Sequence, residues 1–245
     1  MNELSVQLYS VRDAFATDST RTLARLAEIG FTQVEPYGIL ENLESLRTGL
    51  ASSGLTAPTA HAALLGDGVD RHAVLAAAAG LGIAVVIEPM VEQARWQRPA
   101  DIAATAAALN DAAKIAAEHG VAVGYHNHWW EPASQVDGRS GLELLAEHLD
   151  PAVVLEVDTY WATAAGADAP ALLRRLGDRV RAIHVKDGGL ALDGSGQVPA
   201  GQGRLPLAEV LDAAPNALRV VEFDRYDNIF DGLAASLRRL RGAAR

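Results

Sequence analysis

The sequence lacks cysteine and has few aromatic or basic residues. It contains no Cys among 245 residues, and aromatic side chains make up 5%. Without Cys there is no disulfide scaffold, no thiolate zinc site and no cysteine nucleophile. The 21 Lys and Arg are outnumbered by 31 Asp and Glu, which gives a net charge of −10. A surface this acidic repels phosphate backbones, so we expect no nucleic-acid partner.

The sequence also lacks a long apolar run. Its apolar stretches end well before the roughly 18 residues that a membrane-spanning helix needs. The first residues show neither the basic nor the apolar region of a secretory signal. We therefore expect no membrane partner and a cytoplasmic location. The content of 49% hydrophobic and 21% charged residues is typical of a folded globular protein.

Short β-branched runs alternate with longer helical patterns along the chain. The pattern predicts strands at 4–9, 33–35, 57–61, 84–88, 122–127, 153–157, 180–185 and 218–223. It predicts helices at 19–29, 40–53, 71–81, 99–119, 141–148, 170–176, 207–213 and 229–241. Eight strand–helix units predict the α/β class and a single (β/α)8 TIM barrel with parallel strands and outer helices, occupying residues 1–245 as one domain. A doubly wound open sheet is the alternative, which the missing Gly-x-Gly-x-x-Gly motif disfavours.

Polar or titratable side chains stand at the end of nearly every predicted strand. They are Gln7, Tyr9, Glu35, His61, Glu88, His126, His128, Glu156, Asp158, His184, Lys186, Glu222 and Asp224. In this kind of barrel the active site lies at the carboxyl ends of the strands. Residues two apart on a strand face the same way, so each closely spaced pair in this set shares a face. Buried carboxylates are costly unless paired or metal-bound, so their mixture with imidazoles predicts a divalent cation such as Mn, Co, Zn or Fe.

Several motifs resemble the xylose isomerase-like superfamily, which includes sugar phosphate isomerases and epimerases, dehydratases and endonuclease IV. The resemblance runs nearly end to end, and its members are TIM barrels. Strand five is closer to the inosose dehydratase branch. The segments that carry the resemblance are 6–13 (VQLYSVRD), 30–35 (GFTQVE), 125–131 (YHNHWWE), 156–161 (EVDTYW), 183–187 (IHVKD), 201–203 (GQG) and 221–224 (VEFD).

The resemblance implies a metal site with four strand-end ligands, which are Glu, Asp, His and Glu in many members. In this sequence the matching positions are His126, Asp158, His184 and Glu222. The epimerases use their two metal-bound Glu residues as opposed bases, so His126 at the first position leaves a dehydratase or a one-base isomerase open. We expect one divalent ion, Mn²⁺ first, with Mg²⁺, Co²⁺ or Zn²⁺ as alternatives, and no organic cofactor.

The implied chemistry is proton abstraction next to a carbonyl, through an enediolate that the metal stabilises. Glu222 is expected to be the base, while His128 and Lys186 are expected to move the second proton or protonate a leaving hydroxyl. Glu156 is expected one layer deeper, in an internal ion pair. Substrate contacts are expected from His61, Glu88, Glu131, Trp161 and Arg12.

These expectations leave four hypotheses. The first is a metal-dependent isomerase or epimerase of a small sugar or cyclitol. The second is a lyase of the same fold that dehydrates a keto-sugar or keto-cyclitol, or eliminates from a 3-keto-glycoside. The third, DNA cleavage of the endonuclease IV type, is disfavoured by the net charge of −10. The fourth is a non-catalytic sugar-binding or partner subunit, and a homo-oligomer stays open.

Overall fold

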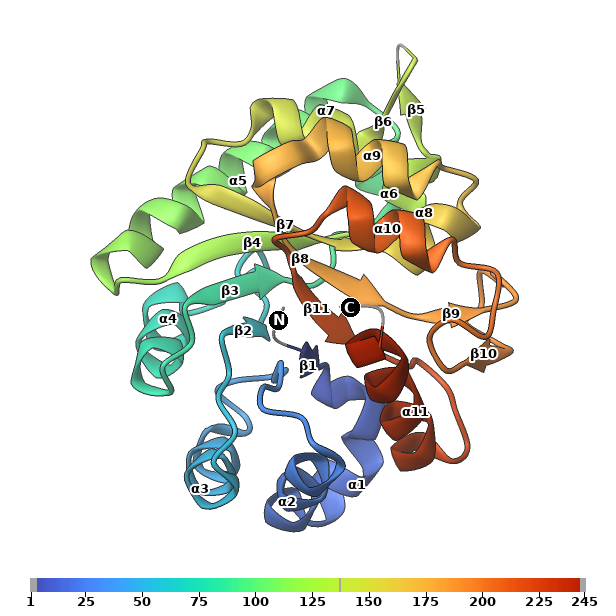
Figure 1. The fold of residues 1–245 in the computed structure, drawn as a ribbon. Coiled ribbons are helices and arrows are strands. Elements are labelled where there is room, and N and C mark those ends of the chain that lie inside the picture. The colour runs from blue at the N-terminus through green and yellow to red at the C-terminus, as the bar shows by residue number, and fades with distance from the viewer. Residues whose placement is uncertain (1–3, 137, 243–245) are drawn as a thin grey trace.

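The computed structural model describes residues 4–136 and 138–242. Within these ranges, parallel strands form one curled seven-stranded sheet in the order β1, β11, β8, β7, β4, β3 and β2 (Figure 1). The strands are β1 (Leu4–Val6), β2 (Thr59–His61), β3 (Val85–Glu88), β4 (Ala122–His126), β7 (Val153–Asp158), β8 (Val180–Val185) and β11 (Leu218–Val221). Each of these strands begins and ends within three residues of the bounds that the sequence predicts.

The segment 33–37 fills the place between β1 and β2 where the second strand was predicted. A parallel bridge joins Glu35 to Gln7 on the β1 side, and another joins Tyr37 to His61 at the end of β2. The proline between these two bridges has no N–H to donate, so the segment cannot make a continuous ladder. It connects the two edges of the sheet and closes the predicted barrel, although it is not a regular strand.

Helices surround the sheet and cover its outer face (Figure 1). They are α2 (Ser19–Ile29), α3 (Leu43–Ser53), α4 (Arg71–Gly80), α5 (Pro99–Glu118), α7 (Gly141–His148), α9 (Ala169–Leu176), α10 (Leu207–Ala213) and α11 (Ile229–Gly242). Gly30 ends α2 with a φ of 113°, a left-handed backbone that glycine adopts without strain. The α/β barrel predicted from the sequence is confirmed. None of the described helices is both long and apolar enough to cross a membrane.

Short elements that the pattern did not predict lie in the connections. They are η1 (Leu8–Val11), α1 (Arg12–Thr17), η2 (Gln93–Trp96), α6 (Trp130–Ala133), α8 (Thr159–Ala164), η3 (Gly177–Arg179), the antiparallel pair β5 (Gln135–Val136) and β6 (Arg139–Ser140), and the antiparallel pair β9 (Asp187–Gly188) and β10 (Gln197–Val198). They are too short to show a periodic pattern. Most of them follow the carboxyl ends of strands and so help to shape the site.

Close packing of α2 against α3 depends on a small residue. A Cβ added at Gly49 of α3 would overlap the fully buried side chain of Leu23 on α2. We expect Gly49→Ala to lower the free energy of unfolding by about 1–3 kcal/mol, because the overlap outweighs the better helix propensity of Ala. Urea denaturation would measure the change.

The matched control is Gly80→Ala at the end of α4, where an added Cβ meets no atom within 4 Å. This variant should be neutral or more stable by up to about 1 kcal/mol. Equal losses of stability in both variants would contradict the packing argument.

Candidate active site

A cavity of about 840 Å³ lies at the carboxyl ends of the strands. We call it the central cavity. Its polar side carries predicted site residues from β2, from β4 and from the segments that follow β4, β8 and β11. They are His61, His126, His128, Lys186, Glu222 and Asp224. The structure therefore brings together residues that are up to 163 positions apart in the sequence, counted from His61 to Asp224.

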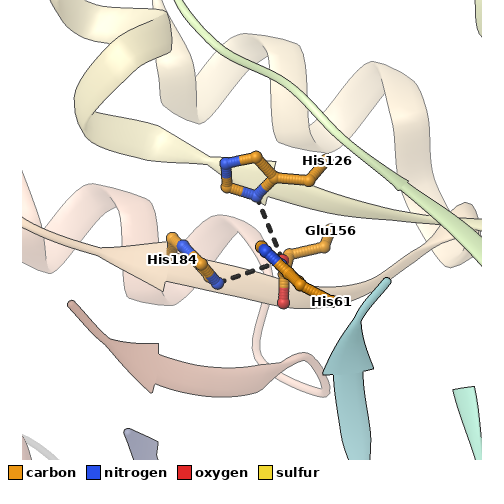
Figure 2. Close-up of side chains that lie close together, drawn as sticks. All are labelled: His61, His126, Glu156 and His184. Atoms are coloured by element: carbon orange, nitrogen blue, oxygen red, sulfur yellow. Dashed lines mark hydrogen bonds and ion pairs between the residues drawn. The ribbon is translucent and has the colours of Figure 1, made fainter. Parts of the chain in front are cut away.

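Beneath this cavity, imidazoles gather around the carboxylate of Glu156 (Figure 2). Glu156 Oε2 lies 2.6 Å from His61 Nε2, 3.0 Å from His126 Nδ1 and 3.0 Å from His184 Nε2. Glu35 joins the group from the irregular segment, with its Oε1 2.7 Å from His184 Nε2. The ion-pair role predicted for Glu156 stays a prediction, and these contacts support it.

Strand register brings these side chains together. His126 on β4 pairs with Glu156 on β7, and Asp158 on β7 pairs with His184 on β8. The register of β7 and β8 shifts between Leu155 and Glu156, which marks a bulge. Bulges re-aim side chains near active sites. Here the shift sets Asp158 opposite His184.

Three of the four predicted metal ligands, Asp158, His184 and Glu222, come together beside Glu156, and His126 approaches this group at Asp158. His184 Nδ1 lies 2.7 Å from Glu222 Oε2 and 4.0 Å from Asp158 Oδ2. His126 Nε2 lies 3.9 Å from Asp158 Oδ2. Asp158, His184 and Glu222 each offer a ligand atom within 4.8 Å of the others. Another group, formed by His61, His126, Glu156 and His184, meets the same criterion.

Lys186 occupies the space between the carboxylates. Its Nζ lies 3.0 Å from Asp158 Oδ2, 2.7 Å from Glu222 Oε2 and 3.0 Å from Asp224 Oδ1. A buried ammonium needs such partners, because desolvation alone would cost several kcal/mol. These carboxylates raise the pKa of Lys186 well above its ordinary value, although burial acts to lower it.

The electrostatics divide the site into ionised and neutral groups. Burial acts to raise the pKa of Glu222, but Lys186 and His184 hold it well below its ordinary value. Burial outweighs the same neighbours at Asp158 and raises its pKa to about 6. Burial, followed by the positive charge of Lys186, lowers the pKa of His128 to about 3. At neutral pH Glu222 is therefore a carboxylate and His128 a neutral imidazole.

Other predicted substrate contacts have internal partners. Glu88 accepts hydrogen bonds from the backbone N–H groups of Leu64 and Leu65 at 2.7 and 2.9 Å. Glu131 accepts the Tyr125 hydroxyl at 2.6 Å and the backbone N–H of His128 at 2.9 Å. Neither carboxylate is among the described residues that line the central cavity, so direct contact with substrate stays a prediction.

Arg12 and Trp161 line a smaller cavity of about 300 Å³. It shares Tyr9, His128 and Asp224 with the central cavity, so the two are neighbours. The Arg12 guanidinium lies 4.4 Å from the centre of the Tyr9 ring. Their roles in substrate binding also stay predictions.

Sequence reasoning missed Gln197, which lies in the long loop after β8. Its amide nitrogen donates to Asp224 Oδ2 at 2.6 Å, and its oxygen accepts the Asp224 backbone N–H at 2.7 Å. Asp187 orders this loop by accepting the backbone N–H groups of Gly201 and Leu205 at 2.8 and 3.0 Å. Nothing in the sequence singles out this glutamine.

The sequence pattern of the family described as xylose isomerase-like TIM barrel matches residues 23–230. The chain belongs to this family. The match covers most of the barrel, including every strand end discussed above except the N-terminal Gln7 and Tyr9. None of the curated proteins compared with the chain matches it.

Several solved structures share the fold of this chain. A sugar phosphate isomerase/epimerase from Parabacteroides distasonis has a TM-score of 0.82 and 20% identity, covering 99% of this chain and 94% of that one. The probable 3-DHS dehydratase AsbF from Bacillus anthracis has a TM-score of 0.76 and 17% identity, with 98% of each chain covered. A family member from Mycobacterium smegmatis in complex with magnesium has a TM-score of 0.73 and 14% identity, covering 99% and 96%. At these identities the likeness shows the fold alone.

Glu131 makes the stability of this family member depend on pH. Burial raises its pKa from 4.5 to about 8, even though Tyr125 and His128 donate hydrogen bonds that act to lower it. The folded protein therefore holds a proton on Glu131 that the unfolded chain releases above about pH 4.5. Its contribution to stability is fully present below that pH and is lost as the pH rises to about 8.

In the wild-type protein we expect this titration to lower the free energy of unfolding by a few kcal/mol between pH 5 and 8. Glu131→Gln has no such proton to lose, so its free energy of unfolding should lack this decrease. Gln can still accept the His128 N–H, and the Tyr125 hydroxyl can turn to accept from its amide. Urea denaturation of both proteins across this pH range is the measurement. Parallel stability curves would contradict the assignment.

Proposed function

We propose that this family member is a metal-dependent isomerase or epimerase of a sugar or cyclitol. The observation that carries the proposal is the orientation of two imidazoles. His126 turns Nδ1 toward Glu156 and Nε2 toward Asp158, while His184 turns Nε2 toward Glu156 and Nδ1 toward Glu222. Histidines that bind a metal commonly donate their other N–H to a carboxylate, which fixes the ring.

This orientation favours the predicted ligands His126, Asp158, His184 and Glu222, with Glu156 as the carboxylate that orients them. The imidazole nitrogens of this donor set suit Zn²⁺, and its carboxylate oxygens suit Mn²⁺ or Mg²⁺. Asp158 Oδ2 is buried and accepts no hydrogen bond within the described part of the chain, although the Lys186 ammonium lies 3.0 Å away. The residues present therefore fit a divalent cation.

The group of His61, His126, Glu156 and His184 is the alternative position for the ion. Glu156 Oε1 is buried and has no hydrogen-bond partner among the described residues. Its other oxygen, however, already contacts all three imidazoles, as an orienting carboxylate does. We therefore favour the position beside Glu222, which also lines the central cavity.

When bound, a divalent ion would act as a Lewis acid that polarises the carbonyl of the substrate. The chain's own residues supply the proton transfer. Glu222 is a carboxylate on the cavity wall and is placed to accept the proton from the carbon next to the carbonyl. Lys186, 2.7 Å from Glu222, and the neutral His128 face the same cavity and can exchange the second proton.

A lyase is the second candidate, and a specific observation favours it. The cavity side of the predicted ligand set has Glu222 as a carboxylate but an imidazole at the position of the other base that the epimerases use. Lys186 is held as an ammonium and can donate a proton to a leaving hydroxyl. A single base paired with an acid is suited to elimination of water.

We expect the native protein to bind about one divalent ion per chain. Loss of a residue that only orients a ligand typically weakens metal binding by roughly 10–100-fold. Asp158→Asn removes a ligand, so it should weaken Mn²⁺ binding by more than this. Calorimetric titration with Mn²⁺ measures this without any substrate.

The matched variant is His61→Gln, which changes only the alternative ligand group. It should weaken Mn²⁺ binding by no more than that range. If His61→Gln abolishes binding and Asp158→Asn does not, the ion belongs to the Glu156 group. Failure of the wild-type protein to bind Mn²⁺, Zn²⁺ or Mg²⁺ would overturn the proposed function.

Glu222→Gln should abolish exchange of solvent deuterium into the carbon next to the carbonyl, because an amide cannot accept the proton. NMR in D₂O at saturating Mn²⁺ follows the exchange with D-fructose, L-ribulose and myo-2-inosose as probes. Exchange without water loss supports an isomerase, whereas loss of water from the inosose supports the lyase.

The control is Glu209→Gln, which removes an exposed carboxylate on α10 and should exchange like the wild-type protein. Exchange at the wild-type rate in Glu222→Gln would exclude Glu222 as the base. No exchange with any probe in the wild-type protein would contradict the proposed function.

A further inference from the structure

Large hydrophobic side chains are exposed around the two cavities. Among the described residues they are Tyr9, Leu40, Met90 and Leu192, with exposed fractions of 44%, 41%, 55% and 46%. The first three line the central cavity, and Leu192 lines the smaller one. Exposed apolar side chains that gather in one place mark a binding surface, whereas scattered ones are ordinary. Their position therefore indicates a ligand with an apolar part.

One side of the central cavity is apolar. This apolar wall comes from η1, from the irregular segment and from the residues that follow the irregular segment, β2 and β3. Its principal members are Tyr9, Tyr37, Ile39, Leu40, Val69 and Met90. Tyr9 and Tyr37 meet edge to face with ring centres 5.7 Å apart, so the wall includes a fixed aromatic corner.

The opposite side is polar and holds the proposed reaction centre. It is formed from β4, β8 and β11, and it presents Lys186 and Glu222 to the cavity. The cavity volume of about 840 Å³ falls within the range of roughly 300–1,000 Å³ typical of pockets for drug-sized ligands. A bare monosaccharide on the polar side would leave the apolar wall in water.

The charges of the central cavity disfavour a phosphorylated ligand. Lys186 is the only Lys or Arg among the described residues that line it, and carboxylates surround its ammonium. Glu41 and Asp70 add further negative charge on the rim. Asp70 also caps α4 by accepting the Ala73 N–H at 3.0 Å, so this helix end already holds an anion.

We propose that the substrate is an uncharged keto-sugar that carries an apolar group, such as an aryl or alkyl glycoside. The sugar lies on the polar side of the central cavity, and the apolar group lies against the apolar wall. This inference rests on the proposed function for the position of the sugar. Its apolar part rests on the exposed side chains and the charges alone.

Binding of matched probes tests the inference. The probes are the methyl and phenyl β-glucosides oxidised to a ketone at carbon 3, together with 3-keto-glucose and its 6-phosphate. Calorimetric titration of the Mn²⁺-loaded protein gives each Kd. We expect the phenyl probe to bind at least about 10-fold more tightly than the methyl probe, from the apolar area that the ring buries. The phosphate should bind at least about 10-fold more weakly than 3-keto-glucose.

Variants locate the apolar group. In the double variant Leu40→Ser/Met90→Ser the phenyl and methyl probes should bind with nearly equal Kd values. Leu192→Ser changes an equally exposed side chain in the smaller cavity and should keep the preference. Loss of the preference in Leu192→Ser alone would move the apolar group to the smaller cavity and overturn the assignment to the apolar wall.

Other outcomes separate this inference from the proposed function. The inference would be overturned by equal Kd values for the phenyl and methyl probes, or by no binding of the phenyl probe. It would also be overturned if the phosphate bound more tightly than 3-keto-glucose, through Arg12 and Arg225 of the smaller cavity. Deuterium exchange in these cases would leave the proposed function intact. A preference for the phenyl probe without deuterium exchange into any ketone would support this inference and contradict the proposed function. A dimer that dissociates in the double variant, with no phenyl preference, would assign the wall to a second copy of the chain.

Discussion

Glu156 places a carboxylate of 1% exposure among the imidazoles of His61, His126 and His184. Alone, a carboxylate at this depth would cost several kcal/mol, so it requires its partners. The partners in turn are fixed by it, because each ring has one nitrogen tied to Glu156 or close to it. The remaining nitrogens of His126 and His184 can then point only toward Asp158 and Glu222. Glu156, joined at His184 by Glu35, thus sets the direction of both imidazoles in the proposed metal site.

The register between strands brings these residues together, because they are far apart in the sequence. His61, His126 and His184 come from β2, β4 and β8, which the barrel brings around Glu156 on β7. The bulge between β7 and β8 adjusts the register by one residue. A slip of one residue on any of these strands would turn its imidazole to the outer face. The helices outside the barrel therefore support the chemistry indirectly, by holding that register.

The sequence predicts the composition of the site better than its pairing. The alternation of strands and helices, the glycine after α2 and the polar residue at each strand end suffice to predict the barrel and the residues that meet in it. Which carboxylate contacts which imidazole depends on register between strands far apart in the chain. The irregular segment at 33–37 contains Pro36, which interrupts the ladder directly after three residues whose polar–apolar alternation alone predicts a strand. Gln197 lies in a loop whose order depends on hydrogen bonds from backbone groups to Asp187, and these leave no pattern in the sequence.

The balance of charge is the physical reason why we propose a cation in this site. The carboxylates of Glu35, Glu156, Asp158, Glu222 and Asp224 lie within ion-pair distance of Lys186 or His184. His61 pairs with Glu35 and Glu156, which raise its pKa although burial acts to lower it. Even with His61 charged, three monovalent cations cannot neutralise five carboxylates. Burial also raises the pKa of Asp158 to about 6. Without a metal, the site reduces its negative charge by binding protons. A divalent ion would replace those protons, keep the carboxylates ionised at lower pH and leave Lys186 to Asp224, which already holds it at 3.0 Å. The same excess of carboxylates that would attract the ion also repels a phosphate, so the proposed metal and the proposed uncharged sugar both rest on one distribution of charge.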